Sequence, residues 1–179
     1  MKKKLSVYNI VIVVILALII IISSLVIFVN PVKKNIRKPV TNMSEQPVAV
    51  PKPVFRKDGE LRFIDSKTND ILATINIEVA DSDAEREQGL MYRESMAENE
   101  GMLFLMGAEA LQSFWMKNTI ISLDILYADS DRRIVSIHKN CKPYSLDQIP
   151  SGQPASYVVE VNAGYCDKYG IEPGDLISF

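Results

Sequence analysis

Two carboxylic acids, Asp124 and Glu160, are the side chains best placed for chemistry, because each interrupts a strongly apolar segment. Two acids at a suitable separation are the minimum that a glycoside hydrolase needs, since one donates a proton while the other acts as base or nucleophile. Polar groups within apolar strands more often satisfy buried backbone groups or form ion pairs. We therefore favour structural pairing of these acids with Arg86 and Lys117 over catalysis.

An aromatic residue and two amides extend this candidate site. If the segment 114–119 is extended, Trp115 and Lys117 share one face, because side chains alternate along a strand. In a second strand-like segment, Glu160 and Asn162 would lie together on the face opposite the core. The predicted ligand-binding set draws on both segments and comprises Arg86, Trp115, Lys117, Asn118, Asp124, Glu160 and Asn162.

No other catalytic signature stands out in the sequence. The sole histidine, His138, lies in a strand-like segment with no nucleophile motif near it, so we expect it to face solvent. The sequence shows no glycine-rich phosphate loop and no His/Cys spacing typical of metal ligands. We therefore predict no metal site and no cofactor, assign no catalytic residue, and favour a non-enzymatic role.

Cys141 and Cys166 are the only two cysteines, so the chain can form at most one internal disulfide. A bridge needs Cα atoms about 4.4–6.8 Å apart and an oxidising compartment. Two inert buried thiols are the alternative, and the sequence leaves both open.

The amino-terminal residues have the pattern of a membrane anchor. Three lysines precede an uncharged, largely aliphatic run of 25 residues from Leu5 to Val29. A helix of about 20 apolar residues spans a bilayer. A cleavable signal peptide has an apolar region of about 7–15 residues that ends in small residues, whereas this run ends in bulky ones. We predict that residues 1–29 form a single-pass transmembrane anchor whose partner is the lipid bilayer.

The orientation of the anchor follows from its flanking charges. Basic residues lie on both sides of the span, so the excess of Lys and Arg gives no decision. A short charged tail followed directly by the apolar run has the layout of an uncleaved export signal. We therefore expect a cell-membrane protein whose carboxy-terminal part lies outside the cytoplasm.

Composition divides the rest of the chain in two. Residues 30–53 carry five prolines among polar residues, which predicts a Pro-rich spacer without a core. Residues 54–179 show regular apolar alternation over a length typical of one domain. This domain holds 12 basic and 21 acidic residues, a formal charge of −9. Because such a field repels phosphate backbones, we do not expect a nucleic-acid partner.

Strand patterns dominate the domain. Apolar residues alternate from Ile71 to Ala80, and Leu61 to Ile64 would be the hairpin partner. Ser82 and Glu85 form a capping-box pattern, which predicts a helix from there to about Met91. Further strands are predicted at 102–106, 113–118, 123–128, 132–138, 157–162 and 176–179, and a short helix near 167–169. This order predicts a mainly β (α+β) fold, a compact barrel-like or folded antiparallel sheet with one packed helix.

Several short blocks carry a resemblance to a known family. They are Glu85-Arg86, Gly89-Leu90-Met91, Gly101-Met102-Leu103-Phe104, Phe114-Trp115-Met116-Lys117-Asn118-Thr119, Leu123-Asp124-Ile125, Val159 to Gly164, and Gly174-Asp175. In these blocks and their spacing the chain resembles the domain of unknown function 192 family, also called uncharacterised protein family 0127. The resemblance implies a small β-rich domain, often exported or membrane-attached, without an assigned activity. The cysteine pair is not part of the shared pattern.

Together these observations predict a membrane-anchored extracytoplasmic domain that acts as a binding or scaffold module for an unknown ligand or envelope protein. The alternative is a cell-envelope glycan hydrolase that uses the Asp124 and Glu160 pair.

Overall fold

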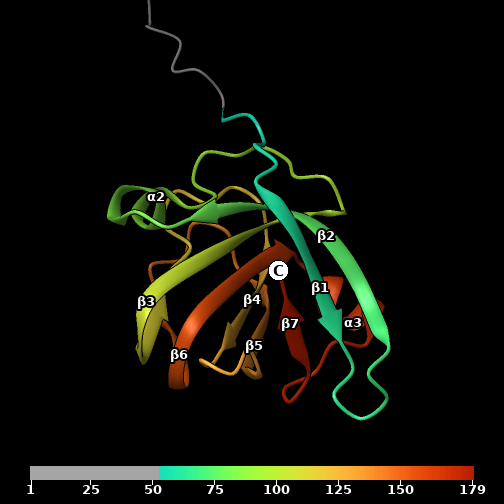
Figure 1. Ribbon diagram of the computed structural model, residues 1–179. Helices are drawn as coiled ribbons and strands as arrows, with labels where there is room; N and C mark the ends of the chain where they lie inside the picture. The colour runs from blue at the N-terminus through green and yellow to red at the C-terminus, as the bar shows by residue number, and fades with distance from the viewer. Residues whose placement is uncertain (1–52) are drawn as a thin grey trace, which may run out of the picture. The chain divides into compact units, whose positions relative to one another are not determined.

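One seven-stranded sheet builds most of the fold of residues 53–179, the part of the chain that the computed structural model describes (Figure 1). The sheet order is β5-β4-β6-β3-β2-β1-β7. The strands are β1 (Gly59–Ile64), β2 (Ile71–Ala80), β3 (Glu100–Phe114), β4 (Leu123–Ala128), β5 (Ile134–Cys141), β6 (Ile149–Asn162) and β7 (Leu176–Ser178), with the helices α2 (Asp83–Gln88) and α3 (Tyr165–Tyr169). The mainly β architecture expected from the sequence is confirmed.

The sheet is not purely antiparallel. β2 and β3 run parallel, whereas the other neighbouring strands pair antiparallel. Parallel neighbours need a crossover of about a dozen residues or more, and α2 with the loop that follows it supplies this connection. The crossover also places α2 beside the sheet, where it forms one side of the pocket described below.

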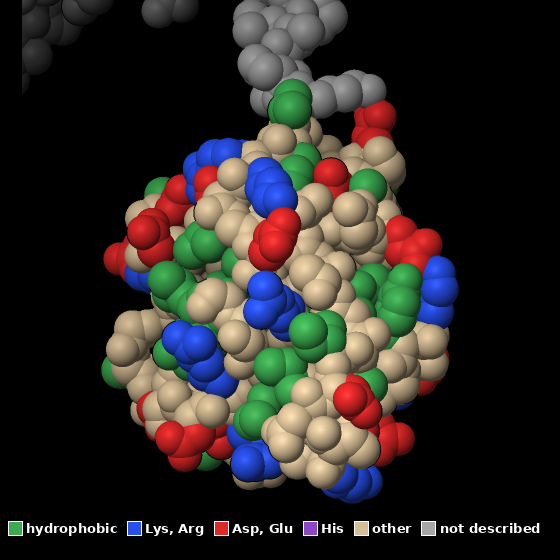
Figure 2. Space-filling model, turned by 45° about the vertical axis from the view of Figure 1, so that its right-hand side comes forward, with side chains coloured by type: hydrophobic (Ala, Val, Ile, Leu, Met, Phe, Trp, Pro, Cys, Tyr) green, Lys and Arg blue, Asp and Glu red, His purple; other side chains and the backbone are tan. Residues whose placement is uncertain are grey.

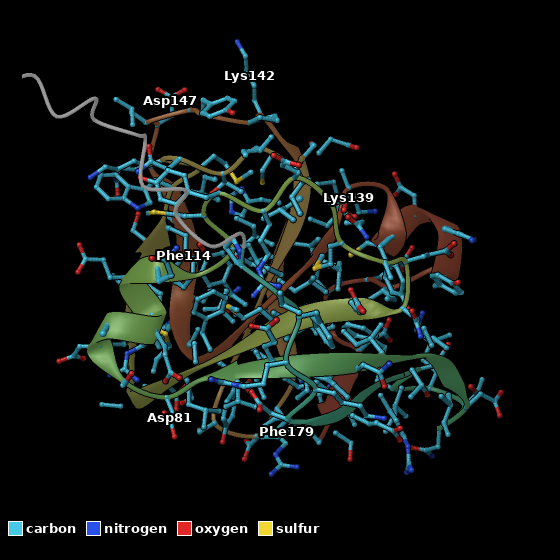
Figure 3. The ribbon with its side chains drawn as sticks, turned by 90° about the horizontal axis from the view of Figure 1, so that it is seen from above. Asp81, Phe114, Lys139, Lys142, Asp147 and Phe179 are labelled. Atoms are coloured by element: carbon cyan, nitrogen blue, oxygen red, sulfur yellow. The ribbon has the colours of Figure 1, made fainter. Side chains whose placement is uncertain are left out.

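The two edges of the sheet meet. Arg133, just before β5, pairs with Leu176 of β7. The amide of Ile134 donates to the carbonyl of Asp175 at 2.8 Å, and the amide of Ile177 donates to the carbonyl of Arg132 at 2.9 Å. These bonds roll the sheet into a barrel-like shape, and side chains fill its interior (Figure 3).

Two apolar clusters stabilise the sheet, one on each side. The inner core receives residues from all seven strands and from α3, including Leu61, Leu103 and Val159. The outer core covers the other side of β3, β4 and β6, including Phe104, Ile125 and Tyr127. Every residue of β4 is buried because its two faces contribute to different clusters. The outer core is closed by chain segments outside the sheet.

The α2 helix begins as the sequence predicts. The Ser82 hydroxyl accepts from the Glu85 amide at 3.3 Å, and the Glu85 carboxylate accepts from the Ser82 amide at 3.2 Å. The predicted end at Met91 is wrong, because Gly89 leaves the helix with φ of 44°. A Cβ at Gly89 would lie 3.3 Å from the Phe104 ring, so the glycine allows the chain to turn tightly against β3.

Two predicted strands form one long strand. The segments 102–106 and 113–118 were expected to be separate, but β3 runs without interruption from Glu100 to Phe114. Its register with β6 shifts between Leu105 and Ala110, where Gly107 has φ of 77°. The predicted strand beyond Phe114 is wrong, because residues 115–118 form a turn that ends the ladder. The alternation assumed for Trp115 and Lys117 therefore does not apply.

The predicted anchor at 1–29 and the predicted spacer up to residue 52 lie outside the described residues. Within residues 53–179, no helix combines the length and apolar character that crossing a membrane requires. On the face shown in Figure 2, Lys and Arg side chains lie among Asp and Glu side chains.

Candidate functional site

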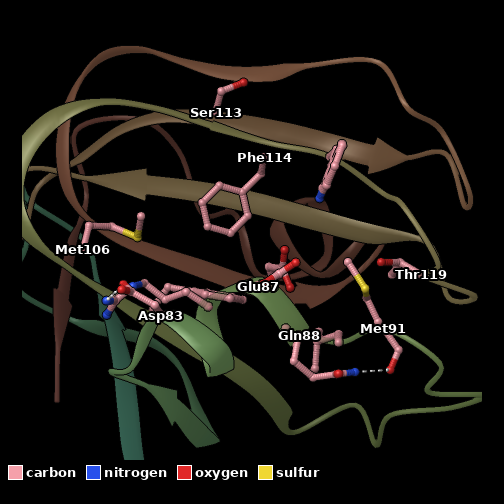
Figure 4. A pocket seen from close by; sticks show the side chains of 14 residues that line it. Asp83, Glu87, Gln88, Met91, Met106, Ser113, Phe114 and Thr119 are labelled. Atoms are coloured by element: carbon pink, nitrogen blue, oxygen red, sulfur yellow. Dashed lines mark hydrogen bonds and ion pairs between the residues drawn. The ribbon is translucent and has the colours of Figure 1, made fainter. Parts of the chain in front are cut away.

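A cavity of about 270 Å³ opens between α2, the turn after it and the end of β3. We name it the Glu160 pocket, and its principal lining residues are Arg86, Leu90, Phe104, Phe114, Trp115 and Glu160. The Phe114 ring points into the pocket, while Met91 lies on the side of α2 (Figure 4). The volume is just below the about 300–1,000 Å³ range of common small-molecule sites, so a ligand here would be small.

Aromatic rings form the apolar wall of the pocket. Phe104 and Phe114 meet edge to face with ring centroids 5.0 Å apart, and Phe114 meets Tyr127 in the same way at 5.9 Å. Such contacts fix ring orientation. Trp115 is 42% exposed, and the Lys117 ammonium lies 4.8 Å from its ring centroid. The aromatic wall is closely packed at Phe104 and Phe114 and more exposed at Trp115.

Glu160 is the polar residue of greatest interest in the pocket. The residue is only 5% exposed, and among the described residues none donates a hydrogen bond to its carboxyl or forms an ion pair with it. Its cross-strand neighbours, Met102 and Ile125, are both apolar. Burial without a partner disfavours the charged form and raises the pKa of Glu160 to about 8. At neutral pH the carboxyl is therefore mostly protonated.

Arg86 lines the same pocket, but its guanidinium is already engaged. It donates to the carbonyl of Asp81 at 2.6 Å, to the carbonyl of Leu105 at 2.8 Å and to the carboxylate of Asp83 at 2.6 Å. These bonds fasten α2 to β3. The predicted structural pairing of Arg86 or Lys117 with Glu160 or Asp124 is wrong, because within the described residues Arg86 pairs with Asp83 instead.

Asp124 lies on the other side of the sheet. It pairs with Val161 in the β4–β6 ladder, whereas Glu160 pairs with Ile125, so the two carboxyls point to opposite faces. Asp124 is fully buried and accepts three backbone N–H bonds, from Asn140 at 2.8 Å, Gly164 at 3.2 Å and Cys166 at 3.0 Å. The alternative of an Asp124 and Glu160 hydrolase pair is therefore wrong, and Asp124 has a structural role that fastens β5 and the start of α3.

The two predicted amides also bind other parts of the chain. Asn162 lies on the Glu160 face, but its side-chain amide donates to the carbonyls of Met96 and Ala97 at 3.1 and 3.0 Å. Asn118 adopts φ of 56° in the turn after β3, and its amide lies 3.7 Å from the Met91 sulfur. Of the predicted set, the structure therefore brings together Arg86, Trp115 and Glu160, with Lys117 beside Trp115.

The two cysteines are free and buried. Cys166 belongs to the inner core and Cys141 to the outer core, so they lie on opposite sides of the sheet. The disulfide considered from the sequence is not formed. Burial raises the pKa of Cys141 to about 11 and also raises the pKa of Cys166. Both thiols are therefore unreactive in the folded state.

Sequence reasoning missed the apolar lining. Phe104, Phe114, Leu90 and Met91 lie in blocks that carried the family resemblance, but nothing in their types distinguishes a pocket wall from a core. Gly89 is the available signal, since a glycine within a predicted helix indicates close packing against another element, and a Cβ at Gly89 would lie 3.3 Å from the Phe104 ring.

A larger cavity of about 830 Å³ lies between α2 and β2. Its buried carboxylate is paired: the Arg93 guanidinium meets Glu78 at 2.6 Å, and the amide of Arg56 donates to the same carboxylate. The Nε of Arg93 is buried and has no hydrogen-bond partner among the described residues. Glu78 is therefore neutralised and hydrogen bonded, unlike Glu160. We give the smaller pocket the stronger claim to a ligand, because it alone of the two exposes an unsatisfied carboxyl.

The family DUF192, described as "Uncharacterized ACR", matches residues 64–179. The chain belongs to this family. The described pocket residues from Arg86 to Glu160 all lie within the DUF192 match. The family resemblance stated from the sequence is thus confirmed.

Individual relatives support the assignment. A UPF0127 protein of Thermococcus kodakarensis is 30% identical over 105 residues, which are 58% of this chain and 64% of that protein. The match thus spans less than two thirds of the length of this curated relative.

Two solved structures share the DUF192 fold. A protein of Sinorhizobium meliloti 1021, provisionally described as a transcription regulator, is 40% identical with a TM-score of 0.64 over 66% of this chain and 91% of that chain. A protein of unknown function from Novosphingobium aromaticivorans is 33% identical with a TM-score of 0.65 over 71% of this chain and 91% of that chain.

Proposed function

We propose that this DUF192 domain is a binding module and that the Glu160 pocket is its site for a small ligand. One observation carries the proposal: Glu160 is only 5% exposed, lines a cavity, and has no hydrogen-bond or ion-pair partner for its carboxyl among the described residues. Burying such a group costs stability, because it loses most of its hydration and gains no hydrogen bond from the protein in return. A bound ligand that satisfies the carboxyl would offset this cost.

Binding accounts for this arrangement better than a scaffold role does. In a purely structural domain, an apolar residue at position 160 would pack against Met102 and Ile125 without the desolvation cost. Functional polar groups are commonly kept at some cost to stability. The glycan-hydrolase alternative has no support, because its second carboxylate, Asp124, faces away from the pocket.

A differential ligand screen tests the proposal. The full chain in detergent and its Glu160→Leu variant are heated with each compound of a small-metabolite library. A ligand that binds only the folded state at about 100 times its Kd adds about 2.7 kcal/mol of stability. We expect compounds that raise the melting temperature of the parent but not of Glu160→Leu.

The matched control for the screen is Glu60→Gln, since Glu60 is exposed on β1 and pairs with Lys57. This variant should respond to ligands as the parent does. If every compound that raises the melting temperature of the parent raises that of Glu160→Leu equally, the Glu160 pocket is not the binding site.

We further propose that residues 1–29 hold this domain at the outer surface of the cell membrane, which makes the bilayer a partner of the chain. The sequence pattern of a long apolar run behind a short charged tail supports this. The domain charge of −9 argues against a nucleic-acid partner, so we do not extend the description of the Sinorhizobium relative to this chain.

A reporter fusion tests the orientation. An enzyme that is active only outside the cytoplasm, fused after Phe179, should be active and should sediment with membranes. A fusion at the same position with a reporter active only in the cytoplasm should be silent. Activity of the second reporter with silence of the first would place the domain inside.

A further inference from the structure

Building on the proposed function, we infer that the ligand of the Glu160 pocket presents a primary ammonium group on a short apolar stem. The ammonium would meet the Glu160 carboxylate, and the stem would lie against the aromatic wall.

The Glu160 carboxyl that lines the pocket carries the first step. An ionised Glu160 needs a donor that also balances its charge, and an ammonium supplies both in one group. Arg86 lines the pocket but cannot balance the Glu160 charge, because its guanidinium is held by Asp83 and by two backbone carbonyls. A carboxylate or phosphate ligand could meet Glu160 only in its protonated form, and it would bring no positive charge to balance the ionised carboxylate.

The walls carry the second step. Phe104, Phe114 and Trp115 present rings to the cavity, and the faces of such rings attract cations. Trp115 already attracts one, since the Lys117 ammonium lies 4.8 Å from its centroid. Glu87 also lines the pocket, and because it is exposed its carboxylate adds negative potential at the entrance. An apolar stem with a cationic end fits both the rings and the acids.

A primary ammonium fits better than a quaternary one. The Glu160 carboxylate can accept N–H bonds, and a quaternary nitrogen has none to donate. The cavity of about 270 Å³ also favours a compact head group. A neutral alcohol could bond to the protonated acid, but it would leave the pocket without a positive charge.

Binding of a cation should be coupled to pH. The free pocket holds Glu160 mostly protonated, since its pKa is about 8, and the complex would hold it ionised. The titratable and charged groups that face or adjoin this carboxyl are Tyr127 on β4, Cys141 on β5, Asp83, Arg86 and Glu87 on α2, and Lys117 beside Trp115. The Tyr127 and Cys141 pKa values are both raised, so neither ionises near neutral pH.

The single tryptophan makes the test direct, because Trp115 lines the pocket and is the only tryptophan in the chain. The full chain in detergent is titrated with n-butylammonium while Trp115 fluorescence is recorded. The comparison probes are n-butyltrimethylammonium, n-pentanol and butyrate. A lysine blocked at both backbone ends separates a free amine from a peptide side chain as the source of the ammonium.

We expect saturable binding of n-butylammonium, with an affinity that rises about tenfold per pH unit from about pH 6 to about pH 8. Glu160→Gln should lower the affinity at least tenfold and abolish the pH dependence, while Glu60→Gln should match the parent. Binding of the blocked lysine would identify a peptide side chain as a source of the ammonium. Binding of n-butylammonium without binding of the blocked lysine would identify a free amine as the source. Both results support the ammonium class.

Other results overturn the inference. If n-pentanol, butyrate or the quaternary probe binds as well as n-butylammonium and depends on Glu160, the ligand class is wrong but the pocket proposal stands. If n-butylammonium fails to bind at millimolar concentration, the ligand class is also wrong. The differential screen against Glu160→Leu then decides separately whether the pocket binds any ligand.

Discussion

Replacing Glu160 with glutamine should raise the stability of the folded chain, and the gain should grow with pH. The pKa of this carboxyl is about 8 in the folded state, against 4.5 for an ordinary glutamate. Below about pH 4.5 both the folded and the unfolded chain are protonated at this position, so ionisation of the carboxyl does not change the free energy of unfolding. Between about pH 4.5 and pH 8 the unfolded state releases its proton while the folded state keeps it, so stability falls as pH rises.

The pKa shift of Glu160 spans several units, and each unit corresponds to about 1.4 kcal/mol. Above pH 8 the free energy of unfolding of Glu160→Gln should therefore exceed that of the parent by on the order of 3–5 kcal/mol. Glutamine never ionises and has nearly the same shape. Urea unfolding of the full chain, followed by Trp115 fluorescence, should show near equality at about pH 5 and a clear advantage of Glu160→Gln at about pH 8. Glu60→Gln should show no such trend. A Glu160→Gln variant less stable than the parent at both pH values would mean that the carboxylate has a structural partner.

Replacing Asp124 with asparagine should destabilise the chain by about 2–4 kcal/mol. Asp124 accepts backbone N–H bonds on both of its oxygens, from Asn140 and Gly164 on one and from Cys166 on the other. An asparagine offers one oxygen, and its NH₂ group must face at least one of these donors. The buried amide then loses its partner, and the charge that strengthened the remaining bonds is gone.

The same urea titration measures the Asp124 effect. Asp167→Asn is the matched control, since Asp167 is exposed and forms only a surface ion pair with Lys139, which contributes about 0–1 kcal/mol. If Asp124→Asn costs no more than Asp167→Asn, the three backbone bonds do not hold β5 and α3 as described.

The faces of single strands could be predicted from the sequence. Alternation along 157–162 correctly separated Glu160 and Asn162 from Val159 and Val161, because the period of a strand is fixed at two residues. The start of α2 was also predictable, since the capping box is a local pattern. These features depend only on residues close in the chain.

The pairing between strands could not be predicted. Asp124 and Glu160 lie in neighbouring strands, but a register that places Ile125 opposite Glu160 sends the two acids to opposite faces. A shift of the β4–β6 register by one residue would have placed Asp124 and Glu160 opposite each other on the same face of the sheet. Cys141 and Cys166 also pack into different clusters on opposite sides of the sheet, so they do not form a disulfide.

The environment of Glu160 was also beyond local reasoning. A polar residue opposite the core face of a strand usually meets solvent, but here α2 and the turn after β3 cover that face. This cover buries Glu160 without supplying a partner. The expectation of a structural ion pair failed because Arg86, the arginine that lines the same pocket, instead binds Leu105 and Asp83 and so fastens α2 to β3.

The direct measurement of the central claim is the pKa of Glu160 in the folded chain, read from the pH dependence of its ¹³C-labelled carboxyl resonance and assigned by its loss in Glu160→Gln. An unpartnered carboxyl in the pocket predicts a titration midpoint of about 8. A midpoint at or below the ordinary value of 4.5 would show that the carboxylate is solvated or already paired, and would contradict the account.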